Sequence, residues 1–197
     1  MKKQLIVFAI ICMTLAGTAQ AQQSIFSLNY AISVPLGNTS NYIDQTSGRG
    51  FILEYQKFIN KNWAIGGEFG HATFYKREEN KVYTEGSASL SGIQYRYQYE
   101  WPIFLTANYY VLTGDKIRPY FGLGVGTIAH DRRIDMGIFT DQNTHWQFAI
   151  RPEVGLLYKP TYNTGFKLGV KYYNSFESSD LAGQSNLGIN VGIVFMN

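Results

Sequence analysis

Cysteine is almost missing from this chain of 197 residues, which contains a single one, Cys12. Cys12 lies near the N-terminus and lacks the Leu-Ala-Gly-Cys context of a lipoprotein site. Once the N-terminal segment described below is removed, no cysteine remains in the sequence. Disulfide bonds and thiol chemistry are then excluded in any compartment.

The chain also has no large excess of charge of one sign. Lys2 and Lys3 belong to the N-terminal segment, and without them 15 basic side chains face 14 acidic ones. This near balance provides no electrostatic reason to expect nucleic-acid binding.

Long apolar runs are absent from the sequence after its first residues. A membrane helix needs about 20 mostly apolar residues, so a membrane span in the remaining chain must be built from β-strands. The length from Gln22 to Asn197 is enough for one domain.

The N-terminal segment has the three parts of a secretory signal peptide. Two lysines near the start are followed by an apolar stretch at residues 5–15 and by the small-residue cleavage site Ala19-Gln20-Ala21. A transmembrane anchor is the alternative, but the apolar stretch is shorter than a spanning helix requires. We expect export and cleavage after Ala21, which leaves residues 22–197 as the barrel domain.

The mature chain contains repeated alternation of apolar and polar residues, which is typical of strands with one face of each kind. In the first such segment, Phe26, Leu28 and Tyr30 alternate with Ser27 and Asn29. We predict eight strands, at residues 26–34, 50–56, 63–70, 93–109, 121–126, 146–158, 166–172 and 187–195.

The connections between these strands alternate between long and short. Long polar loops at one end and tight turns at the other are typical of an outer-membrane barrel. We therefore predict an all-β fold, an eight-stranded antiparallel up-and-down transmembrane β-barrel with both termini on the turn side. The long loops are expected at residues 37–47, 76–89, 131–144 and 174–184, and the turns at residues 59–62, 113–117 and 159–164.

The two strand faces indicate which side meets lipid. One face carries bulky aromatic and aliphatic groups, while the other carries glycine, small polar residues and nearly all charges within strands. A soluble barrel, such as a lipocalin-like carrier, would turn its apolar face inward. Eight strands enclose too little space for the bulky face, so we expect that face to contact lipid.

Aromatic residues collect at the turn-side ends of the predicted strands. Amphipathic rings favour the membrane interface, so these residues are expected to form a girdle at the periplasmic surface. Its predicted members are Phe26, Phe58, Trp63, Tyr109, Phe121, Tyr158, Phe166 and Phe195.

Together these features resemble the small eight-stranded outer-membrane barrels: the outer membrane protein A transmembrane domain, outer membrane protein X and the barrels common in Bacteroidetes. The resemblance covers the mature chain and is carried by residues 30–37, 118–126 and 188–195. It implies a bacterial outer-membrane protein that contacts lipid and is inserted by the barrel-assembly machinery. Such barrels commonly end on an aromatic residue, whereas Phe195 is followed here by two more residues. Activity is not implied, because this fold hosts several unrelated functions.

Charged residues on the inward face are balanced in number. An isolated buried charge costs on the order of several kcal/mol, so a narrow lumen favours their pairing. We predict an ion-pair network that plugs the barrel; the alternative is a polar path through a narrow pore. The four acids and four bases are Glu54, Glu68, Glu100, Glu153, Arg96, Arg151, Lys167 and Lys171.

The histidines raise an enzymatic alternative. Lipid A deacylases place a His-x-Ser pair on the lipid-facing surface, with a carboxylate that orients the imidazole. His71 and Thr73 have this spacing, but threonine replaces serine and the strands provide no outward carboxylate. His130 and His145 flank an aspartate-containing loop without the spacing of a metal site. We therefore expect no catalytic residue, metal or cofactor.

An apolar tip lies inside the third long loop. Met136, Ile138 and Phe139 form a possible interaction site, because exposed apolar groups in loops often mark partner surfaces. The alternative is that this tip packs onto a neighbouring loop.

Two prolines lie inside predicted strands. Proline cannot donate to the hydrogen-bond ladder, so Pro102 and Pro152 each predict a bulge.

The combined interpretation is a plugged barrel that anchors four outer loops, and these loops would bind an unknown extracellular ligand in adhesion, binding or envelope stabilisation. The alternatives are a narrow pore or small-solute channel and a lipid-modifying enzyme.

Overall fold

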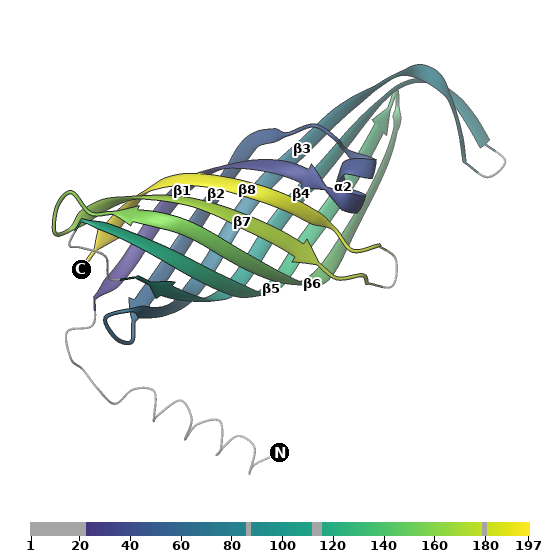
Figure 1. Ribbon diagram of the computed structural model, residues 1–197. Coiled ribbons are helices and arrows are strands. Elements are labelled where there is room, and N and C mark those ends of the chain that lie inside the picture. The colour runs from purple at the N-terminus through teal and green to yellow at the C-terminus, as the bar shows by residue number, and fades with distance from the viewer. Residues whose placement is uncertain (1–22, 86–87, 112–115, 179–180) are drawn as a thin grey trace, which may run out of the picture.

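The computed structural model describes residues 23–85, 88–111, 116–178 and 181–197 (Figure 1). The expected signal peptide and its cleavage site lie outside this part of the chain. No helix in these ranges is long and apolar enough to cross a membrane. The elements are β1 (Ser24–Leu36), α2 (Gly37–Tyr42), β2 (Ser47–Phe58), β3 (Trp63–Glu85), β4 (Ala88–Tyr110), β5 (Ile117–Met136), β6 (Phe139–Tyr158), β7 (Thr164–Ser175) and β8 (Ser185–Met196).

The eight strands form a closed barrel in which each strand pairs antiparallel with the next, and β1 pairs with β8. At the closure, Phe26 lies opposite Phe195 and Leu36 lies opposite Ser185. Closure pairs the backbone groups of both edge strands, as a wall surrounded by lipid requires. The predicted eight-stranded up-and-down barrel is confirmed, and Figure 1 shows the C-terminus at the end of the short turns.

The alternating pattern places bulky residues on the outside of the barrel. In β1, Ser27 and Asn29 are buried, whereas Phe26, Leu28 and Tyr30 are exposed. Polar residues are buried and bulky apolar residues are exposed in the same way around the barrel. The outer surface therefore carries a far larger apolar patch than soluble proteins show. This surface is the one expected to contact lipid.

Small residues on the inner face have a steric cause. Gly126 lies in β5 opposite Phe104 of β4. A Cβ atom on Gly126 would lie 2.0 Å from the carbonyl oxygen of Ile103, far inside van der Waals contact. A larger residue would therefore push the two strands apart.

The strands differ in length, and the barrel wall is uneven in height. Strands β3 to β6 have 20 to 23 residues, whereas the other four have 12 or 13. One side of the barrel therefore extends far beyond the other, at the upper right of Figure 1. We call this side the tall wall.

Two of the predicted long loops are wrong, because residues 76–89 and 131–144 lie mostly in the strands of the tall wall. The ladder continues to the pair Met136 and Phe139, where Gly137 turns the chain with a φ of +61°. A strand with solvent on both faces has no apolar alternation, so its polar sequence looks like a loop.

The prolines do not mark bulges, which corrects the prediction for both. Pro102 lies opposite Ile128, and Pro152 lies opposite Leu123, in unbroken register. Toward its other neighbouring strand, β3 for Pro102 and β7 for Pro152, each proline has no paired residue. The pairs before and after this gap keep the same register. The missing N–H group therefore costs a hydrogen bond without an inserted residue.

The first long loop contains the short helix α2, which lies against the outer ends of β1 and β8 (Figure 1). Two side chains attach it to the chain before β8. The amide of Asn38 donates to the carbonyl of Gly183 at 2.8 Å, and the hydroxyl of Thr39 donates to the side chain of Gln184 at 3.0 Å. These bonds place α2 at the outer mouth of the barrel.

Candidate functional site

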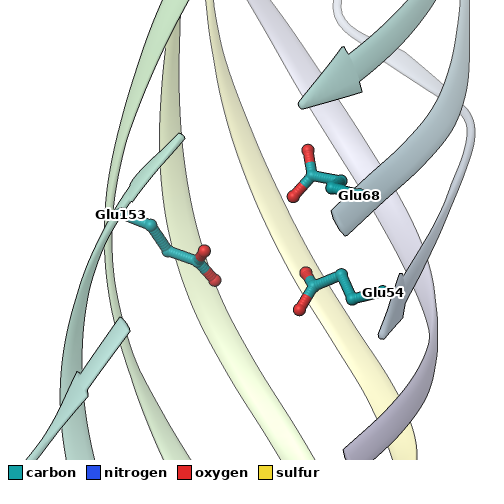
Figure 2. Close-up of side chains that lie close together, drawn as sticks. All are labelled: Glu54, Glu68 and Glu153. Carbon is teal, nitrogen blue, oxygen red and sulfur yellow. The ribbon is translucent and has the colours of Figure 1, made fainter. Parts of the chain in front are cut away.

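Six charged side chains from four strands meet inside the lumen. Three are carboxylates from β2, β3 and β6 that point toward one another across the barrel (Figure 2). Three are cations from β6 and β7, and all six side chains are almost fully buried. The members of this charge cluster are Glu54, Glu68, Arg151, Glu153, Lys167 and Lys171.

Lys171 lies at the centre of the charge cluster. Its ammonium group forms ion pairs with Glu54 and Glu68 and lies 3.8 Å from a carboxylate oxygen of Glu153. One oxygen of each carboxylate lies within 4.8 Å of the others, a spacing that could hold a metal ion. Because Lys171 already contacts all three carboxylates, a metal ion would have to displace its ammonium group.

Arg151 and Lys167 complete the neutralisation of the three carboxylates. Arg151 lies 3.0 Å from Glu68 and also pairs with Glu153. Lys167 pairs with Glu54 and lies 3.4 Å from Glu153. Three positive and three negative side chains make the cluster formally neutral, which offsets much of the cost of removing each charge from water.

The other two predicted lumen charges lie nearer the outer end, so the single eight-membered network is wrong for them. Glu100 lies 3.3 Å from Nδ1 of His130 and accepts a hydrogen bond of 2.7 Å from Asn186. Arg96 lies 3.7 Å from Glu78 in the tall wall. Four residues of strand span about 13 Å, which separates Arg96 from Glu100 along β4.

His130 is buried inside the barrel rather than placed in a solvated loop. Its Nε2 atom lies 3.2 Å from the hydroxyl of Ser175. The alternation of β5 contained the signal, because Gly126, Ile128 and His130 share one strand face. His145 lies opposite His130, and neither belongs to a group of three possible metal ligands within the described ranges.

The turn-side end of the lumen is closed by apolar residues. Phe58, predicted in the girdle, points inward, and its ring centroid lies 5.1 Å from that of Tyr110. The alternation of β2 explains the correction. Successive side chains of a strand point to opposite faces, and because Tyr55 faces outward, Phe58, three residues later, faces inward. We call this group the apolar floor. Its members are Ile25, Phe58, Ala64, Tyr110, Tyr120, Leu157, Val194 and Met196.

The remaining residues of the predicted girdle lie on the outer face. Tyr109 is half-buried beside Trp63, with ring centroids 5.2 Å apart. The other six expose between 44 and 57% of their surface. They are Phe26, Trp63, Phe121, Tyr158, Phe166 and Phe195.

His71 and Thr73 are hydrogen-bonded on the outer side of β3. The distance from Nε2 of His71 to the hydroxyl of Thr73 is 2.8 Å, and the imidazole packs 4.1 Å from the ring of Trp101. In the described part of the chain, no side-chain carboxylate accepts a hydrogen bond from Nδ1 of His71. The pair therefore lacks the orienting group of a catalytic triad.

The predicted apolar tip is smaller than expected. Ile138 and Phe139 expose 93% and 56% of their surface, whereas Met136 is buried. The side chain of Met136 packs beside Gly92 of the neighbouring strand β4. Only Ile138 and Phe139 remain available to a partner, which corrects the interpretation of Met136.

A polar group that the sequence did not reveal lies at the outer mouth. The guanidinium carbon of Arg132 lies 4.3 Å from the ring centroid of Tyr42 in α2, and that of Arg96 lies 5.4 Å away. Arg132 also donates hydrogen bonds to the side chains of Gln98 and Gln184, at 2.9 and 2.7 Å. This group joins the tall wall to α2 and to the chain before β8.

Comparison with known proteins identifies one family. The family model described as the outer membrane protein beta-barrel domain matches residues 8–195. No curated protein matches the sequence.

Solved structures share the fold. Ail, the attachment invasion locus protein of Yersinia pestis, solved with the heparin analogue sucrose octasulfate, is 18% identical with a TM-score of 0.57, covering 89% of this chain and 99% of that one. Neisserial surface protein A is 12% identical with a TM-score of 0.57, covering 89% and 97%. The outer membrane protein OprG of Pseudomonas aeruginosa is 15% identical with a TM-score of 0.52, covering 89% and 96%.

Proposed function

The chain belongs to the outer membrane protein β-barrel family, and we propose that its barrel is a closed anchor whose tall wall binds an extracellular partner. In this proposal the signal peptide is cleaved after Ala21, and the assembly machinery inserts the barrel with its turns in the periplasm. The outer ends of the strands, α2 and the remaining loops then face the surroundings of the cell.

The ion pairing of the charge cluster inside the lumen is the observation that carries the proposal. An ion that entered from outside would have to separate the paired side chains of the charge cluster, and an unpaired buried charge costs on the order of several kcal/mol. Beneath the cluster, the apolar floor offers few polar groups to replace the water around an ion. Transport through the barrel is therefore the weaker interpretation.

The tall wall supports a binding role. It projects beyond the rest of the barrel (Figure 1), and the turn of its β5–β6 hairpin carries the exposed residues Ile138 and Phe139. Apolar groups exposed on a projecting hairpin favour contact with a partner. Ail, which has the same fold, is described as an attachment protein, and this likeness of fold agrees with adhesion.

Planar-bilayer recording tests the closed anchor. The purified, folded barrel should produce no steady current above that of the bare bilayer. A reproducible conductance would contradict closure and favour the narrow pore.

Replacement of the tip tests the binding role. Exchanging residues 134–141 for a two-residue Asn-Gly turn should reduce binding of expressing cells to host cells or matrix, because it removes Ile138 and Phe139. Replacing residues 160–162, at the turn side, is the matched control and should leave binding unchanged. Equal binding by both variants would contradict a role for the tip.

A lipid-modifying enzyme is the second candidate, and the hydrogen bond between His71 and Thr73 is the observation that favours it. The mass of lipid A from expressing cells distinguishes the two functions. An enzyme would produce a mass change that disappears in the His71→Ala variant. The closed anchor predicts the same lipid A mass with the wild type, with this variant and without the protein.

A further inference from the structure

A pocket opens at the outer mouth of the barrel, between α2, β5 and the chain before β8. Its volume is about 320 Å³, roughly ten times the space that one water molecule occupies in the liquid. Its lining combines polar side chains with apolar surface. The residues that matter here are Asn38, Asn41, Tyr42, Arg132, Leu181 and Gln184.

Arg132 is the charged side chain of this lining. Its Nε atom donates to Gln98 at 2.9 Å, and one of its terminal nitrogens donates to Gln184 at 2.7 Å. Both acceptors are neutral amide oxygens. Because a guanidinium group has five N–H donors, three remain for a ligand.

The charge of Arg132 is not neutralised by an ion pair within the described residues. Glu100, the carboxylate that acts on Arg132 through space, lies 3.3 Å from Nδ1 of His130 and forms no ion pair with Arg132. Burial lowers the pKa of Arg132, as expected for a cation that is partly removed from water. Arginine nevertheless stays charged at any physiological pH, so the pocket contains a fixed positive charge.

Among the charges that act on Tyr42 of the pocket lining, the cations act more strongly than the acid. Burial raises the pKa of Tyr42. Arg132 lowers this pKa, and Arg96 lowers it to a smaller extent. Asp141 raises it, but less strongly than either cation lowers it. Arg96 is compensated by Glu78 at 3.7 Å. Arg132 is therefore the cation that the pocket lining presents to a ligand.

We propose that this pocket binds the carboxylate or sulfate group of an acidic sugar, with Arg132 as the anion-binding residue. A planar guanidinium can bind either group through two parallel hydrogen bonds. Asn38 and Asn41 line the same pocket; the side-chain oxygen of Asn38, whose amide nitrogen donates to Gly183, and the side-chain amide of Asn41 suit the hydroxyl groups of a sugar ring. The inference rests on the proposed surface-binding function and names the chemistry of one ligand.

Isothermal titration calorimetry of the mature barrel in detergent, with D-glucuronate as the probe, tests the inference. The wild type should bind glucuronate, inorganic sulfate should compete, and neutral glucose should bind at least about tenfold more weakly. Arg132→Gln should weaken glucuronate binding by about tenfold or more, because hydrogen bonds to a charged group are lost. Arg132→Lys keeps the charge without the planar fork and should bind with intermediate affinity.

Arg133 provides the matched control. It is the next residue of β5, faces the outside of the wall and pairs with Asp135 at 2.9 Å. Arg133→Gln should therefore bind glucuronate as the wild type does. Migration of unheated samples on gels verifies that each variant is a folded barrel.

Several results would overturn the inference: no heat of binding for the wild type at high millimolar glucuronate, wild-type affinity in Arg132→Gln, or equal losses in Arg132→Gln and Arg133→Gln. The tip replacement separates this failure from that of the proposed function. If it abolishes cell binding while the wild type ignores glucuronate, the surface-binding function stands and the acidic-sugar site is refuted.

Discussion

Replacing Lys171 with methionine removes the ammonium group at the centre of the charge cluster and retains a long, flexible side chain. Three carboxylates would then face two cations. Breaking a buried ion pair by removing one partner costs about 3–5 kcal/mol. Because Lys171 pairs with both Glu54 and Glu68 and lies 3.8 Å from Glu153, we expect a loss near the upper end, about 5 kcal/mol of unfolding free energy.

Urea unfolding of the barrel refolded in lipid vesicles, followed by tryptophan fluorescence, measures this loss. Lys61→Met changes an exposed lysine in the turn between β2 and β3 and should alter the unfolding free energy by less than about 0.5 kcal/mol. The double variant Lys171→Met with Glu54→Gln contains two acids and two bases in the cluster. It should recover most of the loss.

A loss below about 1 kcal/mol in Lys171→Met would refute the idea that the cluster consists of paired, desolvated charges. A double variant no more stable than Lys171→Met would refute the electrostatic explanation in another way. It would assign the loss to packing around the removed ammonium group rather than to an excess carboxylate.

Three further predictions concern the floor, the wall and the mouth. Phe58→Ala should lower the unfolding free energy in urea by about 3–5 kcal/mol, because it opens a cavity in the apolar floor; a loss typical of an exposed residue would place Phe58 outside. Gly126→Ala should impair refolding into vesicles, because its Cβ atom would lie 2.0 Å from a backbone oxygen. The control Gly67→Ala, whose Cβ atom would have its nearest neighbour at 3.7 Å, should refold normally. Equal refolding yields of the two variants would contradict the steric argument. Tyr42→Phe should leave the unfolding free energy unchanged or raise it by up to about 1 kcal/mol, because the hydroxyl of Tyr42 is buried without a partner in the described ranges. A clear decrease in the unfolding free energy would reveal an interaction of that hydroxyl.

The strand number and the orientation of both faces were predictable because the surroundings of the wall differ on its two sides. Lipid selects bulky apolar residues, and a narrow lumen selects small or paired polar ones, so every second residue of a strand obeys the same rule. Phe26 and Ser27 already show the contrast, and the ladder from Phe26 to Phe195 closes the barrel as the pattern predicts. Where both faces of a strand are at least partly exposed, as in residues 76–80, the alternation disappears and the sequence no longer reveals the strand.

Phe58 and His130 illustrate information that was present in the sequence but misread. Phe58 was assigned to the girdle by residue type and position, although its parity relative to Tyr55 places it inside. His130 continues the inward series of β5, yet its position beside polar residues suggested a loop. In both cases the alternation is a better guide than the residue type, because the pleat of a strand allows no exception without a bulge.

The partners in the charge cluster could not be predicted from the sequence. Alternation shows that Glu54 and Glu68 face inward, but the ladder places them directly opposite each other on β2 and β3. Like charges in such a pair destabilise a sheet. Only the stagger of the closed barrel brings Lys171 of β7 across the lumen to contact both, and the stagger is a property of all eight strands.

The chemistry of the lumen changes along its axis in a way that separates anchoring from binding. The floor consists of buried apolar residues, the members of the charge cluster above it pair with one another, and the mouth contains Arg132, which forms hydrogen bonds to two amides and no ion pair within the described residues. A passage for solutes would need compensated, hydrated groups along its whole length, and the two lower layers lack them. A binding site needs a charge that the protein leaves without an ion pair, and within the described residues Arg132, near the outer end, is such a charge. The axial order of the layers therefore argues that recognition occurs at the mouth and on the tall wall, and that the remaining barrel holds them in the membrane.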